Sequence, residues 1–130
     1  MDATAQSTGQ ITGAVQLYID GVGEGNAAKL REAFHPEARM WGSLGGERYD
    51  VPIDEMIAMF DGRGADVDGS YSARIVAVYQ TADTAMVTLA EEGFWGTVSF
   101  VDFFSLCRFG RNWKIVNKTF VHTGGQPPTN

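Results

Sequence analysis

An aspartate lies within the most apolar segment of this 130-residue chain. The alternation of residues 98–107 is typical of a long strand. The residues that share one face of this strand are Val98, Phe100, Asp102, Phe104 and Leu106. An ionised carboxylate is costly to remove from water unless it is paired, hydrogen-bonded or protonated. Asp102 therefore has a partner, lines a wet cavity, or is a neutral acid whose pKa is raised by burial.

Tyr18 and His35 are the other side chains whose chemistry suits a site beside this acid. Tyr18 lies on an apolar helical face, where its hydroxyl either points into a pocket or reaches a partner in the core. A Tyr18–Asp102 hydrogen bond of about 2.7 Å would fit binding or catalysis. His35 precedes Pro36, so its imidazole either caps the carboxyl end of a helix or moves protons. The catalytic candidates are therefore Asp102, Tyr18 and His35.

Aromatic residues on short strands and loops are expected to surround a pocket, with Trp41 and Trp95 at its mouth. Asn117 follows Trp113 and Ile115 in the apolar alternation of the last strand, where a buried amide needs a partner. The expected ligand-binding residues are Tyr18, Trp41, Tyr49, Phe60, Trp95, Phe100, Asp102, Phe104 and Asn117. Alternatively, the pocket is filled by large side chains, namely Phe60, Phe94, Phe100, Phe104 and Trp113.

Several other polar residues indicate structural roles. Glu91 and Glu92, like Asp66 and Asp68, are expected to be solvated charges in or near turns. His122 is expected at an exposed strand end, and the chain's two histidines lack the spacing of metal ligands. We therefore expect no metal site and no cofactor.

The net charge of −6 and the pI of about 4.7 argue against nucleic acids and anionic membrane surfaces as partners. No apolar run reaches the roughly 18 residues that span a bilayer. Residues 1–8 lack the basic and apolar regions of a signal peptide. Cys107, the single cysteine, is expected to be a small buried apolar residue. These features together favour a cytoplasmic protein.

Helices precede strands along the chain. Apolar spacing and turn residues predict helices over 11–22, 27–34 and 53–60, and short strands over 39–42 and 48–51. Longer strands are predicted over 71–79, 84–94, 97–109 and 113–121. This order indicates an α+β domain over 10–122, in which three helices pack on a curved, mostly antiparallel sheet. Residues 1–9 are predicted to be a disordered tail, and residues 123–130 a flexible one.

The strand over 97–109 is apolar on both of its faces. Its second face carries Val101, Phe103, Cys107 and Phe109. A sheet with helices on one side needs another cover for a second apolar face. We therefore expect a homodimer that forms through the outer face of the sheet.

The chain resembles the nuclear transport factor 2-like (NTF2-like) superfamily over residues 10–122. The residues that carry the resemblance are Gly25-Asn26, Leu30, Phe34, His35 to Ala38, residues 102–104 and residues 110–120. Within it, the chain looks most like the branch named "putative lumazine-binding", near the SnoaL-like proteins. The resemblance implies a cystatin-like cone, in which the sheet curls round the helices and leaves a pocket with an apolar base.

Residues 15–34 are also similar to the opening of bacterial ketosteroid isomerases. That resemblance implies that Tyr18 and Asp102 hold the developing oxyanion of an enolate. The aspartate that moves the proton would fall at about Gly42, so the base is absent, and His35 is its best substitute.

Three functions remain open. The first is binding of a small, largely apolar or aromatic molecule in the pocket, which needs no base. The second is acid–base catalysis next to a carbonyl, by an isomerase, dehydratase or cyclase. The third is a structural dimer whose pocket is filled by side chains.

Overall fold

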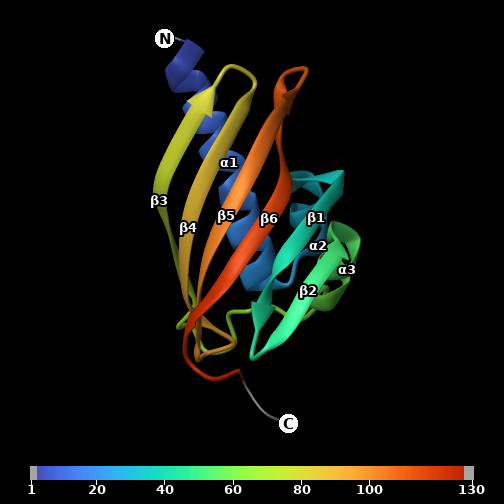
Figure 1. Ribbon diagram of the computed structural model, residues 1–130, viewed down its shortest axis with the longest axis vertical. Coiled ribbons are helices and arrows are strands. Elements are labelled where there is room, and N and C mark those ends of the chain that lie inside the picture. The colour runs from blue at the N-terminus through green and yellow to red at the C-terminus, as the bar shows by residue number, and fades with distance from the viewer. Residues whose placement is uncertain (1–2, 128–130) are drawn as a thin grey trace.

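A six-stranded sheet curves beside one long helix in the computed structural model, which describes residues 3–127 (Figure 1). In chain order, the elements are α1 (Ala3–Glu24), α2 (Ala27–Ala33), β1 (Phe34–Leu44), β2 (Glu47–Pro52), α3 (Ile53–Phe60), β3 (Ser72–Thr81), β4 (Thr84–Phe94), β5 (Val98–Phe109) and β6 (Asn112–Gly124). The strand order is β2-β1-β6-β5-β4-β3, with β1 and β6 parallel and the other neighbours antiparallel. The predicted α+β class, with helices on a mostly antiparallel sheet, is confirmed.

The helices cover one face of the sheet. α1 lies across the β3–β6 half, and α2 and α3 lie near β1 and β2 (Figure 1). Ile11, Val15, Tyr18 and Val22 are fully buried on α1, at the spacing of one helical face. α2 begins where the Asn26 side chain accepts a hydrogen bond of 3.1 Å from the Lys29 backbone N–H.

Both ends of the domain extend beyond the predicted limits. α1 begins at Ala3, so residues 3–9 are helical rather than a disordered tail. At the other end, β6 continues to Gly124, and the Thr97 hydroxyl donates a 2.7 Å hydrogen bond to the Gln126 carbonyl. Residues 1–2 and 128–130 of the predicted tails lie outside the described residues.

His35 and Pro36 belong to a strand, which corrects the expectation that His35 ends a helix. α2 ends at Ala33, and β1 starts at Phe34. The pairing of β1 with β6 shifts register between Phe34 and Arg39, and this irregularity accommodates Pro36, which has no N–H to donate. His35 is therefore the second residue of a strand and not the last residue of a helix.

A bulge in β6 decides which of its side chains face the helices. Ser105 pairs with Asn117, whereas the next residue of β5 pairs with Ile115, so Val116 is the extra residue. Ile115 is buried before the bulge, and Lys118 is buried after it. The bulge thus turns Asn117 away from the core and places Lys118 inside the fold.

The outer face of the sheet carries exposed apolar side chains. We call the outer patch Tyr79, Met86, Phe103 and Val121, which are between 44% and 71% exposed. They come from four neighbouring strands, β3, β4, β5 and β6. Within residues 3–127, no helix is both long enough and apolar enough to cross a bilayer.

Candidate functional site

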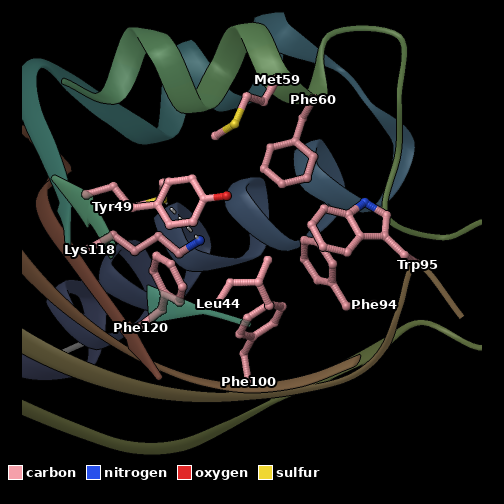
Figure 2. A pocket seen from close by; sticks show the side chains of 10 residues that line it. Leu44, Tyr49, Met59, Phe60, Phe94, Trp95, Phe100, Lys118 and Phe120 are labelled. Carbon is pink, nitrogen blue, oxygen red and sulfur yellow. Dashed lines mark hydrogen bonds between the residues drawn. The ribbon is translucent and has the colours of Figure 1, made fainter. Parts of the chain in front are cut away.

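An apolar cavity of about 80 Å³ lies between α3 and the inner face of the sheet (Figure 2). Its wall consists of Met40, Leu44, Tyr49, Met59, Phe60, Phe94, Trp95, Phe100, Lys118 and Phe120. Figure 2 shows the Lys118 amine and the Tyr49 hydroxyl pointing toward the middle of this space. Hydrocarbon, ring and thioether surfaces make up most of the rest of the wall.

Lys118 is an amine buried among soft, apolar groups. Its side chain is only 5% exposed. The ammonium donates weakly to the sulfur atoms of Met40 and Met56, each 3.9 Å away. It also lies 4.9 Å from the centroid of the Tyr18 ring and 5.3 Å from that of Phe120, within cation–π range. In the part of the chain that the structure describes, no oxygen atom forms a hydrogen bond or an ion pair with this amine.

Glu91 is buried in the core, which corrects the expectation of a solvated charge. Its side chain is 1% exposed and accepts hydrogen bonds from the hydroxyls of Tyr71, at 2.7 Å, and Tyr18, at 3.2 Å. Glu91 lies inside because the alternation of β4 that buries Val87 and Leu89 continues to it. Burial raises the pKa of both tyrosine hydroxyls, and the charge of Glu91 raises it further.

Asp102 is fully buried, and neither of its carboxylate oxygens has a hydrogen-bond partner among residues 3–127. The expected Tyr18–Asp102 hydrogen bond is absent because the Tyr18 hydroxyl bonds to Glu91 instead. Burial raises the pKa of Asp102 well above its usual range, and the nearby charge of Glu91 adds to the rise. The positive charge of Lys118 opposes it. The raised pKa favours the neutral form of the Asp102 carboxyl.

The predicted ligand-binding residues divide into two groups. Tyr49, Phe60, Trp95 and Phe100 lie in the cavity wall, whereas Tyr18, Asp102 and Phe104 are buried outside it. Tyr18 and Phe104 pack edge to face, with their ring centroids 5.0 Å apart.

Trp41, Asn117 and His35 lie outside the cavity, contrary to the roles considered for them. Trp41 is 38% exposed, and the Arg48 guanidinium lies 5.2 Å from its ring centroid. Asn117 donates its amide to the Thr119 hydroxyl at 3.0 Å. The His35 ring lies 4.7 Å from that of Phe109, and its Nδ1 accepts a hydrogen bond from a neighbouring backbone N–H.

The position of the missing isomerase base is occupied by another residue. A Cβ atom on Gly42 would lie 2.5 Å from the Phe120 ring and 2.6 Å from the Phe120 carbonyl oxygen. No side chain fits there unless this pair of strands moves apart. Glu91, on β4, is a buried carboxylate that the comparison with the isomerases did not point to.

Sequence reasoning missed Lys118, Glu91 and Tyr71. The apolar alternation of the last strand indicated Lys118. Trp113 and Ile115 are out of phase with Phe120, and one extra residue between Ile115 and Phe120 would place Lys118 on the buried face. Glu91 could have been found by extending the alternation of β4 by one more position. No pattern in the sequence pointed to Tyr71.

Of the residues that the structure describes, no three side chains of the metal-ligating types converge on one point. His122 lies beside the chain end, with its Nε2 atom 2.9 Å from the Gly124 carbonyl oxygen and 2.6 Å from that of Gly125. Cys107 is half-buried and has no disulfide partner, since the chain has one cysteine.

The comparisons with known proteins cover almost the whole domain. The model of the family described as "Putative lumazine-binding" matches residues 6–121. A curated relative, Aldolase FrzH of a Cladobotryum species, is 23% identical over 118 residues, which span 90% of this chain and 92% of that protein.

Solved structures share the fold. An NTF2-like protein of unknown function from Silicibacter pomeroyi has a TM-score of 0.84 at 24% identity, covering 94% of this chain and all of that one. Another, from Shewanella baltica, has a TM-score of 0.83 at 19% identity, covering 96% of this chain and all of that one. A cystatin-like fold protein from Burkholderia xenovorans has a TM-score of 0.67 at 20% identity, with 89% of this chain and 91% of that one covered.

Proposed function

We propose a function on the premise that this chain belongs to the family described as "Putative lumazine-binding", within the nuclear transport factor 2-like superfamily. The protein binds a small, largely apolar molecule, with an oxygen acceptor, in the cavity between α3 and the sheet. The observation that supports this most is the Lys118 amine, which points into an apolar cavity and has no oxygen partner among residues 3–127. A ligand carbonyl would supply the acceptor that the fold withholds.

The size of the cavity limits the ligand. Its volume is about 80 Å³, whereas an apolar cavity of about 150 Å³ holds benzene. An aromatic ring therefore needs a wall residue to move. Met59 is 43% exposed and has an unbranched side chain, so it is the wall residue best able to do so.

The lumazine of the family's description is a flat bicyclic ring system with several hydrogen-bonding atoms. The wall presents few polar groups to such a molecule, chiefly the Lys118 amine and the Tyr49 hydroxyl. Binding a polar ring system here would leave several of its atoms without partners. We therefore expect simple aromatic carbonyl compounds to bind more tightly than lumazine.

Acid–base catalysis next to a carbonyl is the second candidate, and the Glu91–Asp102 pair supports it. A buried carboxylate beside a neutral carboxylic acid provides a general base and a general acid. Both lie just behind the wall, since Glu91 pairs across the strands with Phe100, and Asp102 with Phe120. The relative named an aldolase adds weight, because aldol chemistry takes place next to a carbonyl.

A matched pair of ligands tests the binding function. Acetophenone and α-methylstyrene have nearly the same shape, but only acetophenone carries an oxygen. Titration calorimetry should show acetophenone binding about tenfold more tightly, which corresponds to a hydrogen bond of about 1.5 kcal/mol to a charged donor. In Lys118→Met this preference should disappear, whereas Lys114→Met, a substitution outside the cavity, should retain it. If neither compound binds, the proposal is refuted.

A further inference from the structure

Three lysines occur in this chain, and Lys118 differs from the other two. Lys29 forms an ion pair of 3.0 Å with Glu24, and Lys114 donates a 2.6 Å hydrogen bond to the Glu32 carbonyl. The Lys118 amine lies against two sulfur atoms and two ring faces, and forms no hydrogen bond to oxygen among residues 3–127. Packing does not require an amine there, because methionine or leucine would occupy similar space without the cost of burying an ammonium group.

We propose that the Lys118 amine forms an imine with a small aldehyde or ketone held in the cavity, and that the Glu91–Asp102 pair moves the protons of this step. The inference rests on the proposed binding of a carbonyl compound in the same cavity. A lysine on an apolar wall is suited to this reaction, since its neutral form is a nucleophile and the wall excludes bulk water.

The proton-carrying groups adjoin the amine. Asp102 and Lys118 are diagonal neighbours on the inner face, because Asp102 pairs with Phe120, two residues along β6 from Lys118. The Lys118 ammonium also lies over the ring of Tyr18, whose hydroxyl donates to Glu91. Tyr71 donates to Glu91 as well, which leaves the Glu91 carboxylate hydrogen-bonded and the Asp102 carboxyl without a partner in residues 3–127.

Glu91 and Asp102 can carry every proton that the reaction moves. After the Lys118 ammonium passes a proton to Glu91, the Nζ lone pair attacks the carbonyl carbon. A C–N bond forms, and the C=O π electrons move to the oxygen, which takes the proton of Asp102. The nitrogen then gives one proton back to Asp102, and the hydroxyl leaves as water with the proton that Glu91 received. The products are a protonated imine and one water molecule, both carboxyl groups return to their starting states, and nothing is oxidised or reduced.

The substrate class follows from the wall and from the amine. The ligand has a reactive carbonyl at one end and an apolar body, aromatic or branched, that fits among Phe60, Trp95 and Phe100. An imine at Lys118 would make the hydrogen on the adjacent carbon more acidic. The site would then support the making or breaking of a carbon–carbon bond at that position, with the carboxyl pair as acid and base.

Reductive trapping tests the imine directly. The full-length protein is incubated with benzaldehyde and sodium cyanoborohydride, and the benzylated residues are identified by mass spectrometry after proteolysis. We expect Lys118 to be labelled first, ahead of Lys29, Lys114 and the chain's amino terminus. The label should be lost in Lys118→Arg and retained in the matched control Lys114→Arg. Labelling that instead follows solvent exposure, with Lys118 last, would overturn the proposal.

Two further measurements separate the possible failures. Acetophenone that binds by calorimetry without preferential trapping at Lys118 would leave the binding function standing and overturn the imine. Failure of both would refute both. The role of the carboxyl pair is tested by Asp102→Asn, which should slow trapping about 100-fold, the scale of one general acid–base group. An unchanged trapping rate would remove Asp102 from the step.

Discussion

Asp102→Asn should abolish a pH dependence of stability that the buried acid causes. Because burial and Glu91 raise the pKa of Asp102 in the folded protein, the native state holds a proton that the unfolded chain has released. The contribution of Asp102 to stability is therefore greatest below the pKa of aspartate in the unfolded chain, about 3.9. It falls as the pH rises toward the pKa of Asp102 in the folded protein. The asparagine variant has no proton to lose at this position and should lack the fall.

The size of the effect follows from one proton. Within this window the free energy of unfolding falls by about 1.4 kcal/mol per pH unit. From pH 5 to pH 7, the wild type should therefore lose up to about 2.7 kcal/mol relative to Asp102→Asn. This loss is an upper limit, reached when the pKa of Asp102 in the folded protein lies above pH 7.

Urea unfolding at pH 5, 6 and 7 measures this difference. Asp61→Asn, at an exposed position just after α3, serves as the surface control and should follow the wild type. A gap between the wild type and Asp102→Asn that stays constant from pH 5 to pH 7 would refute the assignment of a neutral, buried acid.

Three more predictions follow from the same contacts. Gly42→Ala should destabilise the protein by about 1–3 kcal/mol, measured by urea unfolding, because its Cβ would overlap the Phe120 ring; an unchanged midpoint would contradict this. Glu91→Gln should cost about 1–3 kcal/mol, because Gln has one acceptor oxygen for the hydroxyls of Tyr18 and Tyr71; a stabilised variant would argue against the network. If two copies pack through the outer patch, the wild type should be a dimer by light scattering. Phe103→Glu, which places a charge in this patch, should be a monomer. A monomeric wild type would count against a homodimer.

Local chemistry allowed much of the fold to be predicted. Asn26 caps the start of α2, as its capping preference indicates. Pro52 lies one residue before the first helical position of α3, which is the position that proline favours. The four long strands were predicted at nearly their observed positions because apolar alternation and the turn residues between the strands mark them. The parallel pairing of β1 with β6 was not predicted, since it joins segments far apart in the sequence and has no turn between them to mark it.

The candidate site was predicted less completely, because it depends on which face each side chain occupies. Because of a single bulge at Val116, Lys118 faces the helices in place of Asn117. A two-residue alternation continued through that bulge predicts the wrong residue for the inner face. Glu91 was expected to be a solvated charge although it lies within the strand predicted over 84–94, and the alternation that buries Leu89 also buries Glu91. Tyr18 and Asp102 were both expected to be near the pocket, but the Tyr18 hydroxyl donates to Glu91, a contact that the sequence pattern does not show.

A crystal structure of the protein grown with acetophenone tests the central claim most directly, since the claim concerns where a ligand's oxygen lies. We expect the ring in the cavity among Phe60, Trp95 and Phe100, the Met59 side chain displaced, and the carbonyl oxygen within about 3 Å of Lys118 Nζ. An unchanged cavity at saturating acetophenone, or a bound molecule whose carbonyl points away from Lys118, would contradict it.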